Sequence, residues 1–174
     1  MKREPNTSAL WLRAMEPEDV DAIYEWENDP SVWNDSAAHQ PFSRHELARF
    51  IEECRGADIY SCRQLRLMAD VGREAVGCVD IFDFEPHHRR AGVGIIVAKR
   101  HRRKGLGLSM LTQLEDFVRR HLCLHQLHCT IAAGNEASLA LFGKAGYRRC
   151  GTLSEWLLDN GRWSDALTFQ KIIE

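Results

Sequence analysis

The 174-residue chain lacks any uninterrupted apolar run of about 18 residues, the length that a membrane-spanning helix needs. Its N-terminal stretch also lacks the apolar segment of a secretory signal, so we expect no membrane partner and a cytoplasmic location. The six cysteines show no framework spacing, which in that compartment favours free thiols over disulfides. A composition of 44% hydrophobic and 28% charged residues excludes a disordered chain.

The sequence also lacks the residue spacings of common metal-binding and nucleotide-binding motifs. The run 121–129 is rich in histidine and cysteine, but no other CxxC or HxxxH pair completes a closed tetrahedral site, so we expect no metal. No GK[ST] sequence forms a Walker loop, and no third glycine completes a Rossmann fingerprint. The net charge of −2 and the lack of a second basic stripe argue against nucleic acid as a partner, although duplex binding through residues 100–104 stays an alternative.

Charge is distributed unevenly along the chain. Residues 1–96 carry 11 basic and 18 acidic side chains, a net charge of −7, whereas residues 97–174 carry 12 basic and 7 acidic ones, a net charge of +5. Residues 14–43 contain no lysine or arginine but eight acids: Glu16, Glu18, Asp19, Asp21, Glu25, Glu27, Asp29 and Asp35. Such a segment either attracts a cationic ligand or forms a solvated helix face.

Hydrophobic periodicity predicts an α/β domain with a mixed sheet. Strands are expected at 9–13, 64–71, 75–84, 91–98, 128–132, 147–153 and 163–172. Helices are expected at 18–28, after Ser43, at 105–121 and at 136–145, and Glu46 completes a capping box with Ser43. The resulting order is β-α-α-β-β-β-α-β-α-β-β.

Residues 97–107 join a buried strand to a long amphipathic helix through a basic loop. Gly105 and Gly107 let the main chain approach a ligand closely, and the unpaired N–H groups of the first helical turn favour an anion. We interpret this segment as a pyrophosphate site, and the alternative is a capped helix start with solvated charges. The residues assigned to the site are Arg102, Arg103, Lys104, Gly105, Leu106 and Gly107.

Two motifs in this order resemble a known superfamily. The sequence Arg102-x-x-Gly105-x-Gly107 after a strand resembles the acetyl-CoA loop of the GNAT superfamily of N-acetyltransferases. The segment 135–147, Asn-Glu-Ala-Ser-Leu-Ala-Leu-Phe-Gly-Lys-Ala-Gly-Tyr, resembles a second motif of the same superfamily. Residues 12–19 and 26–30 resemble the branch of ribosomal-protein N-terminal and spermidine acetyltransferases, and residues 88–91 are similar to the spermidine enzymes.

The resemblance covers residues 9–173. It implies one N-acetyltransferase domain over residues 1–174, with a largely antiparallel central sheet flanked by helices. It also implies that the pantetheine arm of acetyl-CoA pairs with the strand at Ile95, Ile96 and Val97, where the Val97 N–H would stabilise the oxyanion. Asn135 would then contact the pantetheine amide and Lys144 the outer phosphates. The alternative for Asn135 is a helix N-cap.

The general acid departs from the family pattern. Many GNAT enzymes carry a tyrosine where this chain has Phe142, which we assign to the cofactor site although its ring cannot donate a proton. Ser138, Tyr147 or a water molecule would have to replace that tyrosine. Alternatively, a thiolate with a parent pKa of about 8.5 leaves with little help near neutral pH.

The general base and the acceptor site are expected around the acidic segments. Asp80 and Asp83 are our candidates for the base, and in a regular strand at most one of them faces the site. Further candidates are Glu85, His87 and His88. We expect contact with the acceptor amine from four side chains: Glu25, Glu27, Trp33 and Glu85. Gly92 stands where the spermidine enzymes carry another glutamate, which argues against carrying their substrate over directly.

We therefore expect an acetyl-CoA-dependent N-acetyltransferase that acts by direct transfer, as a monomer or homodimer. A polyamine or another small cationic amine is the favoured acceptor. One alternative is acetylation of a peptide or protein N-terminus. Another is a non-catalytic module that binds acyl-CoA, which the phenylalanine in place of the tyrosine suggests.

Overall fold

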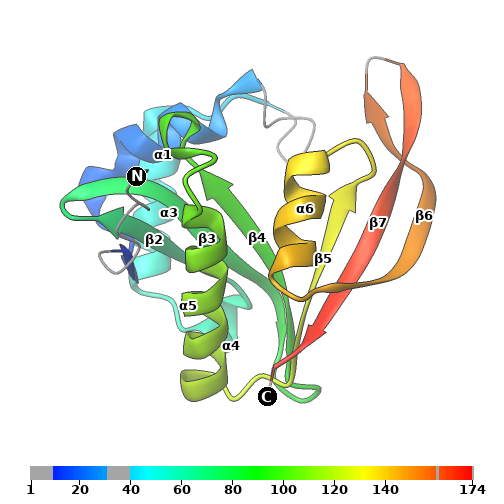
Figure 1. Cartoon of the computed structure of the whole chain (residues 1–174). Coiled ribbons are helices and arrows are strands. Elements are labelled where there is room, and N and C mark those ends of the chain that lie inside the picture. The colour runs from blue at the N-terminus through cyan, green and yellow to red at the C-terminus, as the bar shows by residue number, and fades with distance from the viewer. Residues whose placement is uncertain (1–9, 31–39, 160, 174) are drawn as a thin grey trace, which may run out of the picture.

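The structure, a computed structural model, describes residues 10–30, 40–159 and 161–173 (Figure 1). The strands are β1 (Leu10–Ala14), β2 (Leu65–Val71), β3 (Glu74–Glu85), β4 (Arg90–Val97), β5 (Gln126–Ala132), β6 (Arg148–Asp159) and β7 (Arg162–Ile172). The helices are α1 (Val20–Glu27), α3 (Arg44–Arg55), α4 (Ile59–Cys62), α5 (Leu106–His121) and α6 (Glu136–Lys144), with 3₁₀ turns η2 (Pro17–Asp19) and η3 (Lys99–His101).

The expected element order is confirmed, with two differences. The four-residue helix α4 precedes β2 and is too short to give a periodic pattern. Strand β6 continues six residues past the predicted end at residue 153, because a bulge with Glu155 at a positive φ of 50° interrupts the alternation there. The Ser43–Glu46 capping box is present as predicted. All six cysteines are free thiols, also as expected.

The strands form one seven-stranded sheet in the order β1-β2-β3-β4-β5-β7-β6. Neighbouring strands are antiparallel except β4 and β5, which confirms a mixed, largely antiparallel sheet. Helices α5 and α6 cover one face, where Val79 and Ile81 pack with Leu111 and Leu114. Helices α1 and α3 cover the other face over β2 and β3, and their cluster includes Met15, Ile23, Trp26, Leu47, Ile51, Met68 and Cys78.

Strands β4 and β5 separate after a short paired stretch. They pair only from Arg90 opposite Gln126 to Gly92 opposite His128. Beyond that point β4 pairs with β3 and β5 pairs with β7, so the sheet opens into a V (Figure 1). Helix α5 begins just after the open end of β4, and α6 begins just after the open end of β5.

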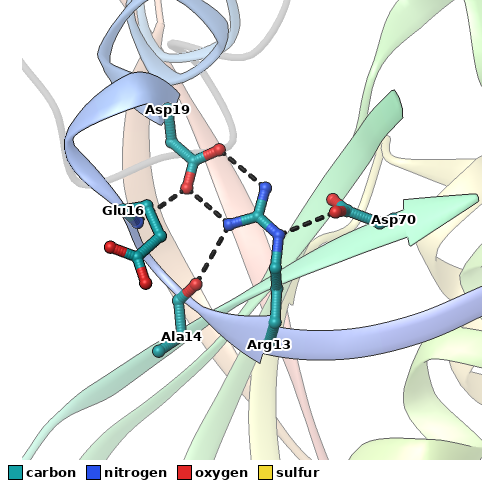
Figure 2. Close-up of polar contacts among 5 residues, drawn as sticks. All are labelled: Arg13, Ala14, Glu16, Asp19 and Asp70. Carbon is teal, nitrogen blue, oxygen red and sulfur yellow. Dashed lines mark hydrogen bonds and ion pairs between the residues drawn. The ribbon is translucent and has the colours of Figure 1, made fainter. Parts of the chain in front are cut away.

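A buried ion-pair network fixes the start of α1 to the sheet (Figure 2). From β1, Arg13 binds Asp19 through two nitrogens at 2.7 and 2.8 Å, and its Nε lies 2.7 Å from Asp70 of β2. Asp19 also accepts the Glu16 N–H at 2.8 Å, which closes the turn before α1. The arginine and aspartate of segment 12–19 therefore serve to position α1.

Candidate active site

The edge of β4 forms one wall of the V. The Ala98 N–H donates to the Val76 carbonyl at 2.9 Å, and Val97 lies opposite Gly77. Because main-chain groups alternate in direction along an antiparallel ladder, the N–H groups of Val97 and Ile95 point away from β3 and into the opening. Ile96 has the opposite orientation: its main chain faces β3 and its side chain packs against the α1 and α3 cluster.

The basic loop brings its charges to the open end of the V. Arg102 Nε donates to the Val97 carbonyl at 3.0 Å, which ties the loop to the end of β4. Gly105 is the N-cap of α5 with φ 79°, a left-handed conformation that favours glycine, and no side chain caps this helix start. Arg103 and Lys104 are exposed beside it. Uncapped N–H groups flanked by cations suit a pyrophosphate.

Two residues of this loop have packing roles that the sequence did not indicate. Leu106 is buried in the core, so its side chain anchors α5. A Cβ at Gly107 would lie 3.0 Å from the Leu141 side chain, so this glycine lets α6 approach the first turn of α5. The close approach that Gly107 permits is therefore between helices α5 and α6.

The second motif forms α6 and the turn after it. Asn135 is the N-cap, and its Oδ1 accepts the Ser138 N–H at 3.0 Å, which is the alternative that the sequence left open for Asn135. Ser138 is half-buried in the first turn, and Lys144 is exposed at the end of the helix.

The aromatic residues of this motif lie in the core. Phe142 is only 3% exposed and meets the ring of Tyr147 edge to face at 5.0 Å. Burial raises the pKa of Tyr147 well above its usual range, and the neighbouring Glu115 adds to the effect. Phe142 has no ionisable group and Tyr147 holds its proton tightly, so neither side chain supplies a proton near neutral pH.

An arginine that the sequence analysis did not single out occupies the centre of the predicted acidic site. Arg66 of β2 lies 2.6 Å from Glu27 through Nη1, and it binds Asp80 through Nε at 2.6 Å and Nη2 at 3.0 Å. All three side chains are largely buried. Glu27 and Asp80, predicted to bind the acceptor and to act as the base, are therefore both paired with one cation.

The remaining predicted acceptor and base residues that the structure describes lie on α1 and β3. Glu25 is exposed on α1, and Trp33 lies outside the described residues. Asp83 is exposed with a positive φ of 49° at a register shift in β3, so the regular alternation expected between Asp80 and Asp83 does not hold. Glu85 accepts the His87 N–H at 3.1 Å and lies opposite Arg90, at the closed end of the V.

A histidine at that closed end was also missed by the sequence analysis. His128 of β5 lies opposite Gly92 and is half-buried. Its ring meets Phe82 edge to face at a centroid distance of 6.4 Å. In the sequence it belongs to the histidine- and cysteine-rich run 121–129. Among the described residues, no group of three or more His, Cys, Asp or Glu side chains is arranged to hold a metal ion.

Comparison with known proteins decides the family. Residues 9–148 match the family model described as the acetyltransferase (GNAT) domain. The chain belongs to the GNAT acetyltransferase family. The expected N-acetyltransferase activity class is thereby confirmed, and the V between β4 and β5 with the basic loop at its mouth is the candidate active site of this acetyltransferase. No helix in the described ranges of this acetyltransferase is long and apolar enough to cross a membrane.

Its relatives include spermidine acetyltransferases. The acetyltransferase is 27% identical to the spermidine N(1)-acetyltransferase of Vibrio cholerae over 91% of this chain and 90% of the relative. A crystal structure of the V. cholerae spermidine N-acetyltransferase with CoA and spermine superposes with a TM-score of 0.86 at 24% identity, covering 95% and 96% of the two chains. A dodecameric structure of the V. cholerae enzyme superposes with a TM-score of 0.79 at 26% identity, covering 95% of this chain and 94% of the other. These likenesses confirm the predicted fold.

Proposed function

We propose that this acetyltransferase transfers the acetyl group of acetyl-CoA to a primary amine of a polyamine. The observation that carries the proposal is the V itself: two β4 main-chain N–H groups point into an opening whose mouth holds an uncapped helix start and exposed cations. A pantetheine arm offers amides that can pair with such an edge as an added strand would. The names of the relatives support both the donor and the acceptor.

The donor would lie along β4 with its pyrophosphate at Gly105. Arg103 and Lys104 would offset the phosphate charge, and Lys144 on α6 would reach the outer phosphates. Asn135, whose Oδ1 is used in capping, keeps its amide N–H groups for the pantetheine. The Val97 N–H would donate to the thioester oxygen as negative charge develops there, and one such donor is worth about 3 kcal/mol of transition-state stabilisation.

The acceptor would approach from the face that carries α1 and α3. Within the described part of the acidic segment 14–43, Asp19 pairs with Arg13, Asp21 with Arg44 and Glu27 with Arg66. Glu18 and Glu25 remain exposed and would attract a polycation. The acidic segment would thus have both of the roles that the sequence left open, with part of it structural and part available to a ligand.

Kinetics across acceptors of increasing positive charge test the proposal. We would measure thiol release from acetyl-CoA with an amino sugar, a peptide with a free N-terminus, spermidine and spermine. The proposal expects kcat/KM to be highest for the polyamines and to fall as salt screens the attraction. A preference for the peptide would support acetylation of protein N-termini instead. Sedimentation of the same sample would test the expected monomer or homodimer against the larger assembly that its neighbour forms.

A further inference from the structure

His128 stands at the closed end of the V on the acceptor face. Its neighbours in β5, Leu127 and Cys129, point into the core under α5 and α6. Because side chains alternate along a strand, His128 points to the opposite face, the one that carries α1 and α3. It belongs to the last residue pair between β4 and β5, so its ring lies where the opening begins.

On this face, the residue of β4 opposite His128 has no side chain of its own. Gly92 lies directly opposite His128, and a Cβ at Gly92 would overlap the Phe82 ring. Phe82 therefore covers the main chain of Gly92 and meets His128 edge to face. Val97, whose N–H would donate to the thioester oxygen, is five residues further along β4, about 17 Å away at the rise of a strand. A chain of bridging water molecules would therefore carry the proton from the amine to the ring.

Burial favours the neutral form of this imidazole. Burial lowers the pKa of His128, the Asp83 carboxylate of β3 partly opposes the shift, and Arg90 of β4 adds to it. From β7, the residue opposite His128 is the uncharged Gln170. A neutral imidazole at pH 7 is ready to accept a proton.

The carboxylates considered as the base are less suited to this task. Asp80 is held by two nitrogens of Arg66, so both of its oxygens already accept hydrogen bonds from a cation. Glu85 accepts a main-chain N–H at the turn before β4. Asp83 is exposed to solvent at the register shift of β3.

We propose that His128 is the general base that deprotonates the acceptor ammonium through bridging water, an inference that rests on the proposed function. One proton passes from the ammonium to the imidazole, and the freed amine attacks the thioester carbonyl carbon. The new C–N bond forms and the C–S bond breaks. The second amine proton goes to the departing thiolate, and the imidazolium returns its proton to solvent. The products are the acetylated amine, the CoA thiol and one proton.

The test compares His128→Gln with wild type in the acetyl-CoA and spermidine assay. Loss of a general base lowers kcat/KM by about 10²–10⁴-fold. We expect wild-type kcat/KM to rise with pH through an ionisation below the ordinary histidine value, and we expect His128→Gln to lose that limb. His121→Gln, at the exposed end of α5, is the matched control and should leave the profile unchanged.

Chemical rescue separates proton transfer from a structural role. His128→Ala leaves a space for free imidazole, so added imidazole should restore part of its activity, with CoA affinity by calorimetry equal to that of wild type. Activity of His128→Gln comparable to wild type would overturn the proposal, as would a failure of imidazole to rescue a variant that binds CoA normally. Wild type that releases no thiol with any amine would instead overturn the proposed function and this inference with it.

Discussion

Replacing Arg66 by methionine removes the cation that pairs with Glu27 and Asp80 while keeping a long apolar stem. In the folded protein the side chains of Arg66, Glu27 and Asp80 are 15%, 11% and 24% exposed, so water replaces little of the lost interaction. Removing one partner of a buried ion pair costs about 3–5 kcal/mol, because the remaining charge stays buried without compensation. The partial exposure of Asp80 places the expected loss at about 3 kcal/mol, the lower end of that range.

Urea unfolding at equilibrium measures this loss, with Arg49→Met as the matched control. Arg49 pairs with Glu53 on the surface of α3, and both side chains are 67% exposed. Such an i,i+4 pair contributes about 0.3–0.5 kcal/mol, so the control variant should be nearly as stable as wild type. A cost for Arg66→Met as small as that of Arg49→Met would show that the buried pairing of Arg66 does not stabilise the fold.

Three further variants test other parts of the structure. Gly105→Asp should abolish CoA binding in calorimetry, since it places a carboxylate beside the phosphates. It should also cost about 1–2 kcal/mol of folding stability, because residue 105 has a φ of 79°. The control variant Gly56→Asp, at another exposed helix end, should bind CoA normally. Glu25→Lys should raise KM for spermidine and leave kcat unchanged; an unchanged KM would place the acceptor elsewhere. Wild-type stability should fall as the pH drops below about 6.5, because the unfolded chain protonates His128 while the folded state keeps it neutral. His128→Gln should reduce that fall. An equal fall in both proteins would contradict the lowered pKa of His128.

Features that depend on neighbouring residues could be predicted from the sequence. The Ser43 capping box and the strand that leads into Gly105 and α5 are local patterns, because the interacting groups lie within a few residues. The order of the elements follows from such patterns, and two motifs in that order indicated the family. The starting point of the V between β4 and β5, by contrast, is set by pairing between strands.

Features that depend on residues far apart in the sequence could not be predicted from the sequence. Arg66 is 39 positions from Glu27, and nothing in the alternation of β2 shows which carboxylates it meets. Because Phe142 lies in the second GNAT motif, we assigned it to the cofactor site, whereas its ring packs in the core against Tyr147. His128 lies in a segment rich in histidine and cysteine, and only the pairing of β5 with β4 places it at the opening. In each case the contact is made by tertiary packing.

The most direct test of the account is mass spectrometry of spermidine after incubation with acetyl-CoA and the purified protein. The proposed function predicts spermidine that carries one acetyl group, in an amount equal to the CoA thiol released, and none with Gly105→Asp. Thiol release without acetylated spermidine, or spermidine acetylated equally well by Gly105→Asp, would contradict it.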